Sequence, residues 1–431
     1  MRGNAALLAI ALGAASGCYD GVGDDTSPLE TFGTSPIDGD DDPTAASDPT
    51  VDDDEEDGES SGGGDDAPPD DGGMDPAPEL EPLTTDQVRF YLGMLAPALA
   101  GRSLSYDENA RIQAEGEAAI IPLIDEWTLS PGFADSMRDM VQNELQASGE
   151  RDGIDFELPG NLVAQVVSDG LPWSTILTAD YCVDAVGSMI ECDTGAPFEA
   201  GVLATRAYLI PNKGRFNLTR ALRMLEVFAC RGYPMEPDIQ IPLEKDIFIP
   251  MFRAQTPDEQ TEEEALGGFG NGAGCYTCHS QFGAHAQFFV KFDSDGLWQG
   301  DATGLQAEGL QENGQPYELG TSYDGLNASH FNDPADAASE QSQMFGETVA
   351  NLREAAEVMA SHPLFYSCAS KNLIGHAFGR ESGTSEEIDQ GLVTALADDV
   401  LAVSDDPTIR DVALTVFTKE EVIRAAVAGL E

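Results

Sequence analysis

Two cysteines and a histidine within one pentapeptide carry the clearest chemical signal in this sequence. Cys275 and Cys278 are three residues apart, and His279 follows at once. On a helical turn, positions i, i+3 and i+4 lie on one face, so two thiols can bond to the vinyl groups of a haem while the imidazole reaches its iron. Cys-x-x-Cys-His is the attachment signature of c-type haem. The motif occurs once, so the sequence predicts one covalent haem c with His279 as the proximal iron ligand.

Two other interpretations of the pentapeptide fit less well. A structural zinc site normally has four ligands, whereas Cys275, Cys278 and His279 supply three, and adjacent ligands strain a tetrahedral site. A thioredoxin-like redox pair is expected beside a βαβ unit, for which the sequence shows no pattern. The spacing therefore favours haem over zinc and over thiol redox chemistry.

The sixth coordination position of the iron is left open by the sequence. Met344 follows His279 by 65 residues, in a less periodic stretch, and is the better placed of two methionines, the other being Met359. A thioether ligand favours outer-sphere electron transfer by raising the reduction potential. His330 or His285 would instead give a bis-histidine site of lower potential, and an open position would allow small molecules to bind.

Four further cysteines suggest disulfides. If Cys18 is assigned to lipid attachment and Cys275 and Cys278 to haem, four cysteines remain: Cys182, Cys192, Cys230 and Cys368. An oxidising compartment would favour two disulfides among them, for which three connectivities are possible. Pairing Cys182 with Cys192 would close a short loop, and pairing Cys230 with Cys368 would then join two domains. Buried free thiols are the alternative.

The first 18 residues have the features of a bacterial lipoprotein signal. Arg2 precedes an apolar stretch over residues 5–15, which is too short to span a bilayer, and Ala15-Ser16-Gly17-Cys18 resembles a lipoprotein processing box. Processing would make Cys18 the lipid-modified N-terminus, with an ordinary secretory signal as the alternative. We therefore expect a lipoprotein of the cell envelope, on the periplasmic side or at the surface of the outer membrane. Export agrees with the haem motif.

The chain is strongly acidic throughout its 431 residues. Its net charge is −57, and the stretch from Asp20 to Glu81 contains 23 acidic residues and no Lys or Arg. Residues 19–82 are predicted to form a disordered acidic linker, because such a composition cannot bury enough apolar surface to offset its ordering entropy. The charge argues against nucleic-acid binding, which needs basic patches. It suits a basic redox protein as partner, or simply a solvated acidic surface.

Helical periodicity predicts a mainly α protein. A helical domain is expected over residues 83–255, a cytochrome c-like helical haem domain over 256–384, and a C-terminal helical module over 385–431. Thr84 and Gln87 resemble a capping box at the first helix, and Asn217 is expected to cap a later one. The helical segments are predicted near 88–101, 108–127, 132–147, 161–169, 217–228, 345–361, 364–378, 385–402 and 407–427.

Several residues around the motif have two interpretations each. Asp293, Asp295 and Asp301 could hold calcium, but the spacing lacks a closing glutamate and favours a solvated turn. The aromatic residues near the motif would either wall a haem pocket or form ordinary core: Phe269, Tyr276, Phe282, Phe288, Phe289 and Trp298.

From Leu171 onward, about 60% of the chain resembles cytochrome-containing proteins first catalogued in planctomycetes and also found in myxobacteria. The segments that carry the resemblance are Leu171–Ser174 with Leu177–Tyr181, Gly201–Leu203, Asn217–Cys230, the haem motif, Phe292–Trp298, Leu364–Arg380 and the tail from Glu387. The resemblance implies an exported haem protein whose haem ligands are Cys275, Cys278 and His279. His376 stands where that family usually has tyrosine, so it is not an inherited ligand.

Together these features predict an exported, lipid-anchored monohaem cytochrome that transfers single electrons. The first alternative is a haem-dependent oxidoreductase acting on peroxide or an organic substrate, although a dihaem peroxidase would need a second motif. The other is a haem sensor or binding protein. The sequence favours an electron carrier over a catalyst.

Overall fold

A computed structural model describes residues 81–248, 273–300 and 329–431, apart from 332, 429 and 431. The predicted signal, the Cys18 lipid site and almost all of the 19–82 linker lie outside the described residues, as does Phe269. In the described ranges, no helix combines the length and apolar character needed to cross a membrane. Contacts group Pro82–Glu431 into one compact unit.

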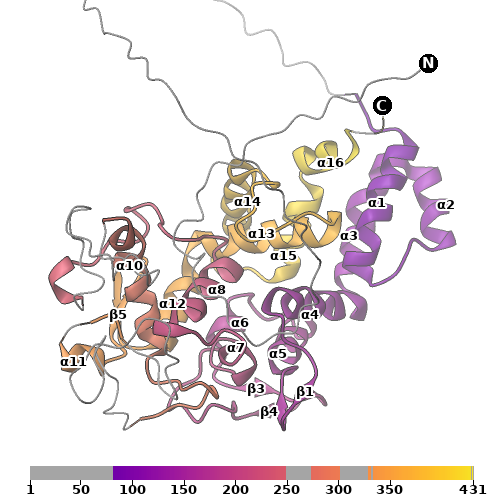
Figure 1. Ribbon diagram of the computed structural model, residues 1–431. Helices are drawn as coiled ribbons and strands as arrows, with labels where there is room; N and C mark the ends of the chain where they lie inside the picture. Colours follow the sequence, from indigo (N-terminus) through magenta and orange to yellow (C-terminus); the bar gives the residue numbers. More distant parts are fainter. Residues whose placement is uncertain (1–80, 249–272, 301–328, 332, 429, 431) are drawn as a thin grey trace, which may run out of the picture. The chain divides into compact units, whose positions relative to one another are not determined.

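The mainly α prediction is confirmed, and most of the unit is built from helices (Figure 1). The α-helices are α1 (Thr85–Ala100), α2 (Tyr106–Glu115), α3 (Ile120–Thr128), α4 (Pro131–Leu145), α5 (Leu158–Ser168), α6 (Thr175–Thr178), α7 (Arg206–Leu209), α8 (Leu218–Phe228), α10 (Ala273–Ala286), α11 (Pro334–Ala337), α12 (Leu352–Ser361), α13 (Pro363–Phe378), α14 (Gln390–Val403), α15 (Ile409–Thr418) and α16 (Glu420–Val427). Short 3₁₀ turns are η1 (Gly116–Ala119), η2 (Arg215–Asn217), η3 (Lys245–Ile247) and η6 (Gln287–Phe289).

Three small antiparallel hairpins complete the described part of the unit. They pair β1 (Glu150–Arg151) with β2 (Ile154–Asp155), β3 (Cys182–Val183) with β4 (Met189–Ile190), and β5 (Ser342–Met344) with β6 (Glu347–Val349). Their registers place Glu150 opposite Asp155, Cys182 opposite Ile190, and Ser342 opposite Val349. Strands of two or three residues are too short to show the alternation by which a strand is predicted.

The start of α1 follows from its capping residues, as predicted. The Thr84 hydroxyl accepts a hydrogen bond from the Gln87 backbone N–H, and the Gln87 side chain accepts one from the Thr84 N–H at 2.9 Å. This reciprocal pair satisfies two backbone donors that the first turn of a helix leaves unpaired. The helix ends where Gly101 adopts a left-handed conformation, with φ of 66°.

Four sequence predictions need correction. The single helix expected over 108–127 is divided into α2, η1 and α3, because Gly116 has φ of 60° and ψ of −132°. The helix expected over 345–361 begins only at Leu352, after the β5–β6 hairpin. The last expected helix is broken at Lys419, whose backbone is extended. Asn217 has a left-handed backbone and makes no side-chain cap.

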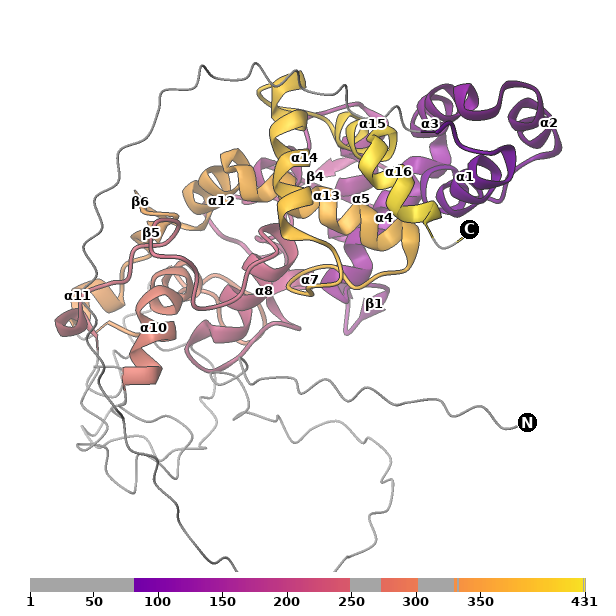
Figure 2. The same cartoon turned by 90° about the horizontal axis from the view of Figure 1, so that it is seen from above.

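The last helices of the chain pack against the first ones. Helix α15 contacts α3, α16 contacts α1, and α13 contacts both α1 and α14, as Figures 1 and 2 show. The Tyr91 hydroxyl donates to the Phe417 carbonyl at 2.7 Å, and Arg410 pairs with Asp125 at 2.5 Å. These contacts cross the predicted boundary at 384/385, and the boundary at 255/256 lies outside the described residues. The division into domains therefore stays a prediction.

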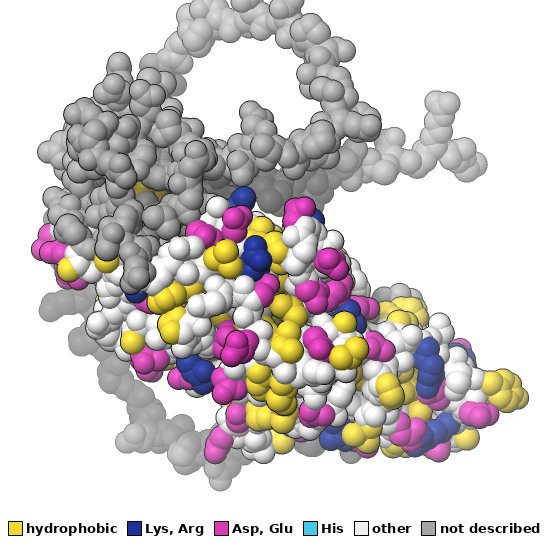
Figure 3. All heavy atoms as spheres, turned by 90° about the horizontal axis from the view of Figure 1, so that it is seen from below, with side chains coloured by type: hydrophobic (Ala, Val, Ile, Leu, Met, Phe, Trp, Pro, Cys, Tyr) yellow, Lys and Arg dark blue, Asp and Glu magenta, His cyan; other side chains and the backbone are white. Residues whose placement is uncertain are grey.

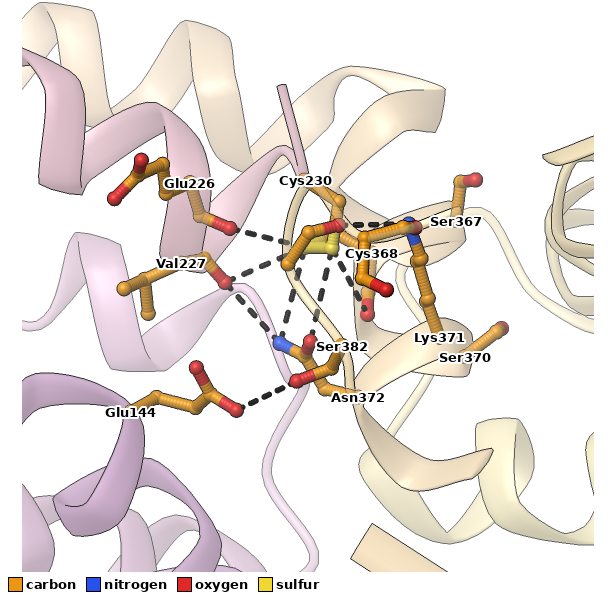
Figure 4. The surroundings of a disulfide bond; sticks show 12 residues. Glu144, Glu226, Val227, Cys230, Ser367, Cys368, Ser370, Lys371, Asn372 and Ser382 are labelled. Carbon is orange, nitrogen blue, oxygen red and sulfur yellow. Dashed lines mark hydrogen bonds between the residues drawn. A yellow bond between two sulfur atoms is a disulfide. The ribbon is translucent and has the colours of Figure 1, made fainter. Parts of the chain in front are cut away.

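Two disulfides join the four cysteines considered above. Cys182 pairs with Cys192 across the base of the β3–β4 hairpin, and Cys230 pairs with Cys368 over a separation of 138 residues. Figure 4 shows the second bridge between the end of α8 and the middle of α13. Beside it, the Asn372 amide donates to the Val227 carbonyl at 3.2 Å. The connectivity is the one that joins the residues before and after the haem motif.

Glu199 is a partly buried carboxyl next to the first disulfide. Burial raises its pKa to about 7, with nearby carboxylates adding to the shift, and its Oε2 has no hydrogen-bond partner among the described residues. Because burial disfavours the charged carboxylate, the fold is most stable when Glu199 is protonated. Its stability therefore declines as pH rises from the unfolded-state pKa of the carboxyl group through the higher folded-state pKa.

We therefore expect Glu199→Gln to raise the free energy of unfolding at pH 8 by about 1–2 kcal/mol, after a discount for partial exposure. The variant should also lose the decline in stability that the wild type shows between pH 5 and pH 8. Urea unfolding of both proteins at the two pH values measures this. Identical pH slopes in the two proteins would show that Glu199 ionises normally in the fold.

Candidate functional site

Helix α10 carries the haem motif near its N-terminal end. The helical backbone runs from Ala273 to Ala286, so Cys275, Cys278 and His279 share one face, as the spacing predicted. Cys278 and His279 are buried, with exposed fractions of 3% and 6%. The Cys275 side chain lies outside the described residues. Helix α10 packs against α8, β5 and η6, which fixes the position of the motif.

The His279 ring is held by a second histidine. Its Nδ1 lies 3.1 Å from Nε2 of His330, within hydrogen-bond distance, and the ring centroids are 5.3 Å apart. Phe282, one turn further along α10, stacks on the His279 ring at 5.9 Å. Burial lowers the pKa of His279 to about 4 and lowers the pKa of His330 well below its usual value. Both rings are therefore neutral at pH 7, so one ring nitrogen donates and the other accepts.

His330 is itself fixed through its neighbours in the chain. The Ser329 hydroxyl donates to Oε1 of Gln287 at 2.7 Å, and Phe331 forms an antiparallel bridge with Phe248. The Phe216 ring packs on His330 with a centroid distance of 5.3 Å. This apolar cluster and the two flanking anchors leave the imidazole little freedom to turn.

Gly283 makes the approach of His330 to α10 possible. It lies one turn after His279, and a Cβ at this position would be 2.7 Å from Cε1 of Phe248 and 3.2 Å from Cβ of His330. Real Cβ atoms do not approach other atoms so closely, so a side chain here would push His330 and Phe248 away from the helix.

We expect Gly283→Ala to lower the free energy of unfolding by about 1–2 kcal/mol, because overpacking outweighs the gain in helix propensity. Gly93→Ala in α1 is the matched control. Its Cβ would meet only Leu104 at 3.8 Å, an ordinary contact, so that variant should gain up to about 1 kcal/mol. Chemical denaturation compares the two. An equal gain in both would mean that the space beside Gly283 is not needed.

His285 is a structural residue, because both of its ring nitrogens have hydrogen-bond partners. Nδ1 lies 2.5 Å from the Tyr233 hydroxyl, and Nε2 lies 3.0 Å from Oε1 of Gln240. Gln281 extends the network by donating to the carbonyls of Met235 and Gln240. The network attaches the segment around 233–241 to α10. A bis-histidine site through His285 would require breaking it.

Met344 and Met359 lie on different elements, and the element that carries Met344 contacts α10 directly. Met344 is fully buried on β5, which packs directly against α10. Met359 is buried on α12 in the same large apolar cluster. Because β5 contacts the helix that carries His279, Met344 remains the better placed thioether, and its role as distal ligand stays a prediction.

The two remaining histidines lie in helix-end and interhelix positions. His362 caps α13, where its Nδ1 accepts from the Leu364 N–H at 3.2 Å. His376 lies 2.9 Å from the Ser136 hydroxyl. Neither is brought to His279 by the contacts described.

The candidate wall residues divide into two groups. Tyr276 donates from its hydroxyl to the Leu243 carbonyl at 2.5 Å, and Phe282 stacks on Tyr233 at 4.2 Å as well as on His279. Tyr276 thus belongs to the motif itself, and Phe282 lies beside it. Phe288 and Phe289 belong to the main apolar core, and Trp298 packs against that core.

The turn after α10 is held by hydrogen bonds. Asp293 Oδ1 accepts from the backbone N–H of Asp295 and Leu297, and Oδ2 accepts from Gln299. Asp301 lies outside the described residues. Within the described ranges, no group of three or more His, Cys, Asp or Glu side chains is placed to hold a metal ion. The hydrogen bonds of Asp293 agree with the turn interpretation.

Buried Arg220 on α8 anchors this same turn. Its guanidinium is fully buried and donates to the carbonyls of Phe292 at 2.8 Å, Asp293 at 2.7 Å and Leu209 at 3.0 Å. Burial lowers its pKa to about 10, so it stays charged at pH 7. Arg220 thus ties α8 to the chain that leaves α10.

A small cavity of about 20 Å³ lies away from the motif, between α4, α8 and α13. Its lining includes Met140, Glu144, Trp173, Phe228 and Asn372 and no residue of α10. It adjoins the Cys230–Cys368 bridge, through Asn372, and offers nothing to the haem motif.

The donor set of α10 fits a c-type haem. With Nδ1 of His279 within hydrogen-bond distance of His330, Nε2 is the nitrogen that would bind iron, and Cys278 would supply a thioether sulfur. Cys278 takes part in a disulfide in this structure, so haem attachment requires its prior reduction. Sequence reasoning considered His330 only as a distal ligand and did not identify it as the partner of the second His279 nitrogen.

No family model, curated protein or solved structure matches this chain.

Proposed function

We propose that this protein is an exported, lipid-anchored monohaem c-type cytochrome that transfers single electrons at the cell envelope. The observation that carries the proposal is the position of the motif: Cys278 and His279 are buried on α10, and the His279 ring is oriented through its Nδ1. The resemblance to the planctomycete and myxobacterial cytochrome-containing proteins adds to this. Lipidation at Cys18 would hold the protein at the membrane by an acidic tether.

The covalent haem would supply a reversible one-electron couple. His279 would present Nε2 to the iron, and Phe282 would shield one face of that ring from water. Met344 is the proposed distal donor, from the strand that packs on α10. Outer-sphere electron transfer moves no proton and therefore needs no general acid or base. A low-polarity environment and fixed ligands would determine the reduction potential of the haem.

The surface charge supports a basic redox partner. On the face shown in Figure 3, Asp and Glu side chains are spread among fewer Lys and Arg side chains. Electrostatic attraction between oppositely charged surfaces accelerates association. A weaker association at higher salt would support this part of the proposal.

The test is production of the full chain in a bacterium with c-type haem maturation, followed by reduced-minus-oxidised spectroscopy. We expect the spectrum of one low-spin haem, with a methionine charge-transfer band that is lost in Met344→Ala and retained in Met359→Ala. The double variant Cys275→Ala/Cys278→Ala is the control and should be colourless. Carbon monoxide binding by the wild type would favour the oxidoreductase or sensor alternatives.

A thiol redox pair is the second candidate, favoured by the disulfide at Cys278. It predicts a colourless protein whose Cys278 is reversibly reduced, with a defined thiol–disulfide potential. Thiol alkylation after graded reduction distinguishes this outcome from haem attachment.

A further inference from the structure

We infer that His330 is the positioning residue of the proximal histidine: it accepts a hydrogen bond from Nδ1–H of His279 and so fixes the orientation and donor strength of the iron ligand. This inference rests on the proposed haem function for its effect on the iron. The contact itself does not depend on haem.

Iron binding at Nε2 of His279 would define the proton positions. His279 would bind iron through Nε2, so its proton is on Nδ1, and the atom 3.1 Å away is Nε2 of His330. His330 must then carry its own proton on Nδ1 and offer a lone pair at Nε2. Both rings are buried, which favours neutral imidazoles. One donor therefore meets one acceptor.

The site around His330 is built to hold it in place. Ser329 and Phe331, on either side, are attached to Gln287 and to Phe248, and Gly283 leaves the space through which the imidazole reaches α10. Partners of this kind orient a metal-bound histidine and raise its basicity. An imidazole acceptor would stabilise the oxidised iron relative to the reduced iron.

The same geometry argues against His330 as the distal ligand. Nε2 of His330 lies within hydrogen-bond distance of Nδ1 of His279, at the opposite edge of that ring from Nε2, so His330 would not be the residue that holds the iron from its other side. Of the distal candidates, His285 is held by Tyr233 and Gln240. The inference therefore strengthens the choice of a methionine.

The test compares His330→Leu, which removes the acceptor, with His330→Gln, whose amide oxygen can replace it. The matched control is His285→Leu, another fully buried histidine, which lies on α10 itself. Midpoint potentials, haem spectra and denaturation midpoints are measured for the full chain with haem. We expect His330→Leu to keep the low-spin spectrum. Its midpoint potential should rise by about 59 mV, which corresponds to a tenfold shift of the oxidised-to-reduced ratio toward the reduced form.

His330→Gln should recover part of that shift, and His285→Leu should lose stability without changing the potential. An unchanged potential in His330→Leu would overturn the inference, and so would loss of the low-spin spectrum, because the latter would make His330 a ligand. A shift of the same size in His285→Leu would also overturn it, as a general effect of core damage.

A haem-independent measurement separates this inference from the proposed function. The chain has five histidines, so ¹⁵N-labelled imidazole signals can be assigned by substitution in the purified protein without haem. The inference predicts His279 protonated at Nδ1 and His330 unprotonated at Nε2, with the His279 pattern changed in His330→Leu. These tautomers in a permanently colourless protein would refute the haem function and leave the contact standing. The opposite tautomers would keep the hydrogen bond but make His330 its donor, and would overturn the inference that His330 is the acceptor.

Discussion

Removal of the Cys230–Cys368 disulfide is expected to lower the free energy of unfolding by roughly 5 kcal/mol. The bridge closes a loop with a sequence separation of 138 residues, and loop-closure entropy lost from the unfolded chain grows with loop length. Both sulfurs are buried, so the double variant Cys230→Ala/Cys368→Ala avoids placing hydroxyl groups in the core. Urea unfolding of the variant and the wild type measures the difference.

The Cys182–Cys192 bridge supplies a control within the same chain. Its sequence separation is 10 residues, for which the same entropy argument gives about 3 kcal/mol. We therefore expect Cys182→Ala/Cys192→Ala to be the milder double variant. A larger loss for the short loop would contradict the loop-length explanation and would place most of the stabilisation in local packing.

Replacement of Arg220 with leucine is expected to lower the free energy of unfolding by about 3–5 kcal/mol. The guanidinium donates to Leu209, Phe292 and Asp293 carbonyls, and each buried acceptor left without a donor costs about 1–3 kcal/mol. Relief from burying a charge offsets part of that sum. Lysine should recover little, because it lacks the planar fork that reaches several acceptors.

Arg353→Ala is the matched control for Arg220. Arg353 pairs with Glu357 one turn away on α12, where both side chains are substantially exposed, and such pairs contribute about 0.3–0.5 kcal/mol. Chemical denaturation of both variants tests the contrast. A similar small loss in the two would show that water can replace the Arg220 hydrogen bonds. The Arg220 variant should also release the turn after α10, which hydrogen-exchange rates around residue 293 would report.

Local signals in the sequence predicted the elements that depend on local chemistry. Thr84 and Gln87 predicted the start of α1, and the spacing of Cys275, Cys278 and His279 predicted one helical face. The break at Gly116 was missed because a glycine within a periodic segment is compatible with a continuous helix; only its positive φ ends α2. The β5–β6 hairpin was missed for a related reason: its strands are too short to show alternation.

Contacts between distant residues could not be predicted in the same way. His330 reaches His279 across 51 residues, and this pairing depends on the bridge between Phe248 and Phe331. The only signal within α10 was Gly283, whose spacing of four residues from His279 indicates an open position on the same face. The packing of α15 on α3 likewise follows from tertiary burial, which helical periodicity cannot assign to a partner.

Mass spectrometry of one proteolytic peptide is the most direct test of haem attachment. The protein is produced with c-type maturation, denatured, reduced, alkylated and digested, and the peptide that contains Cys275–His279 is identified. We predict that this peptide carries one haem, with neither cysteine alkylated. A haem-free peptide with both cysteines alkylated would contradict the proposed function.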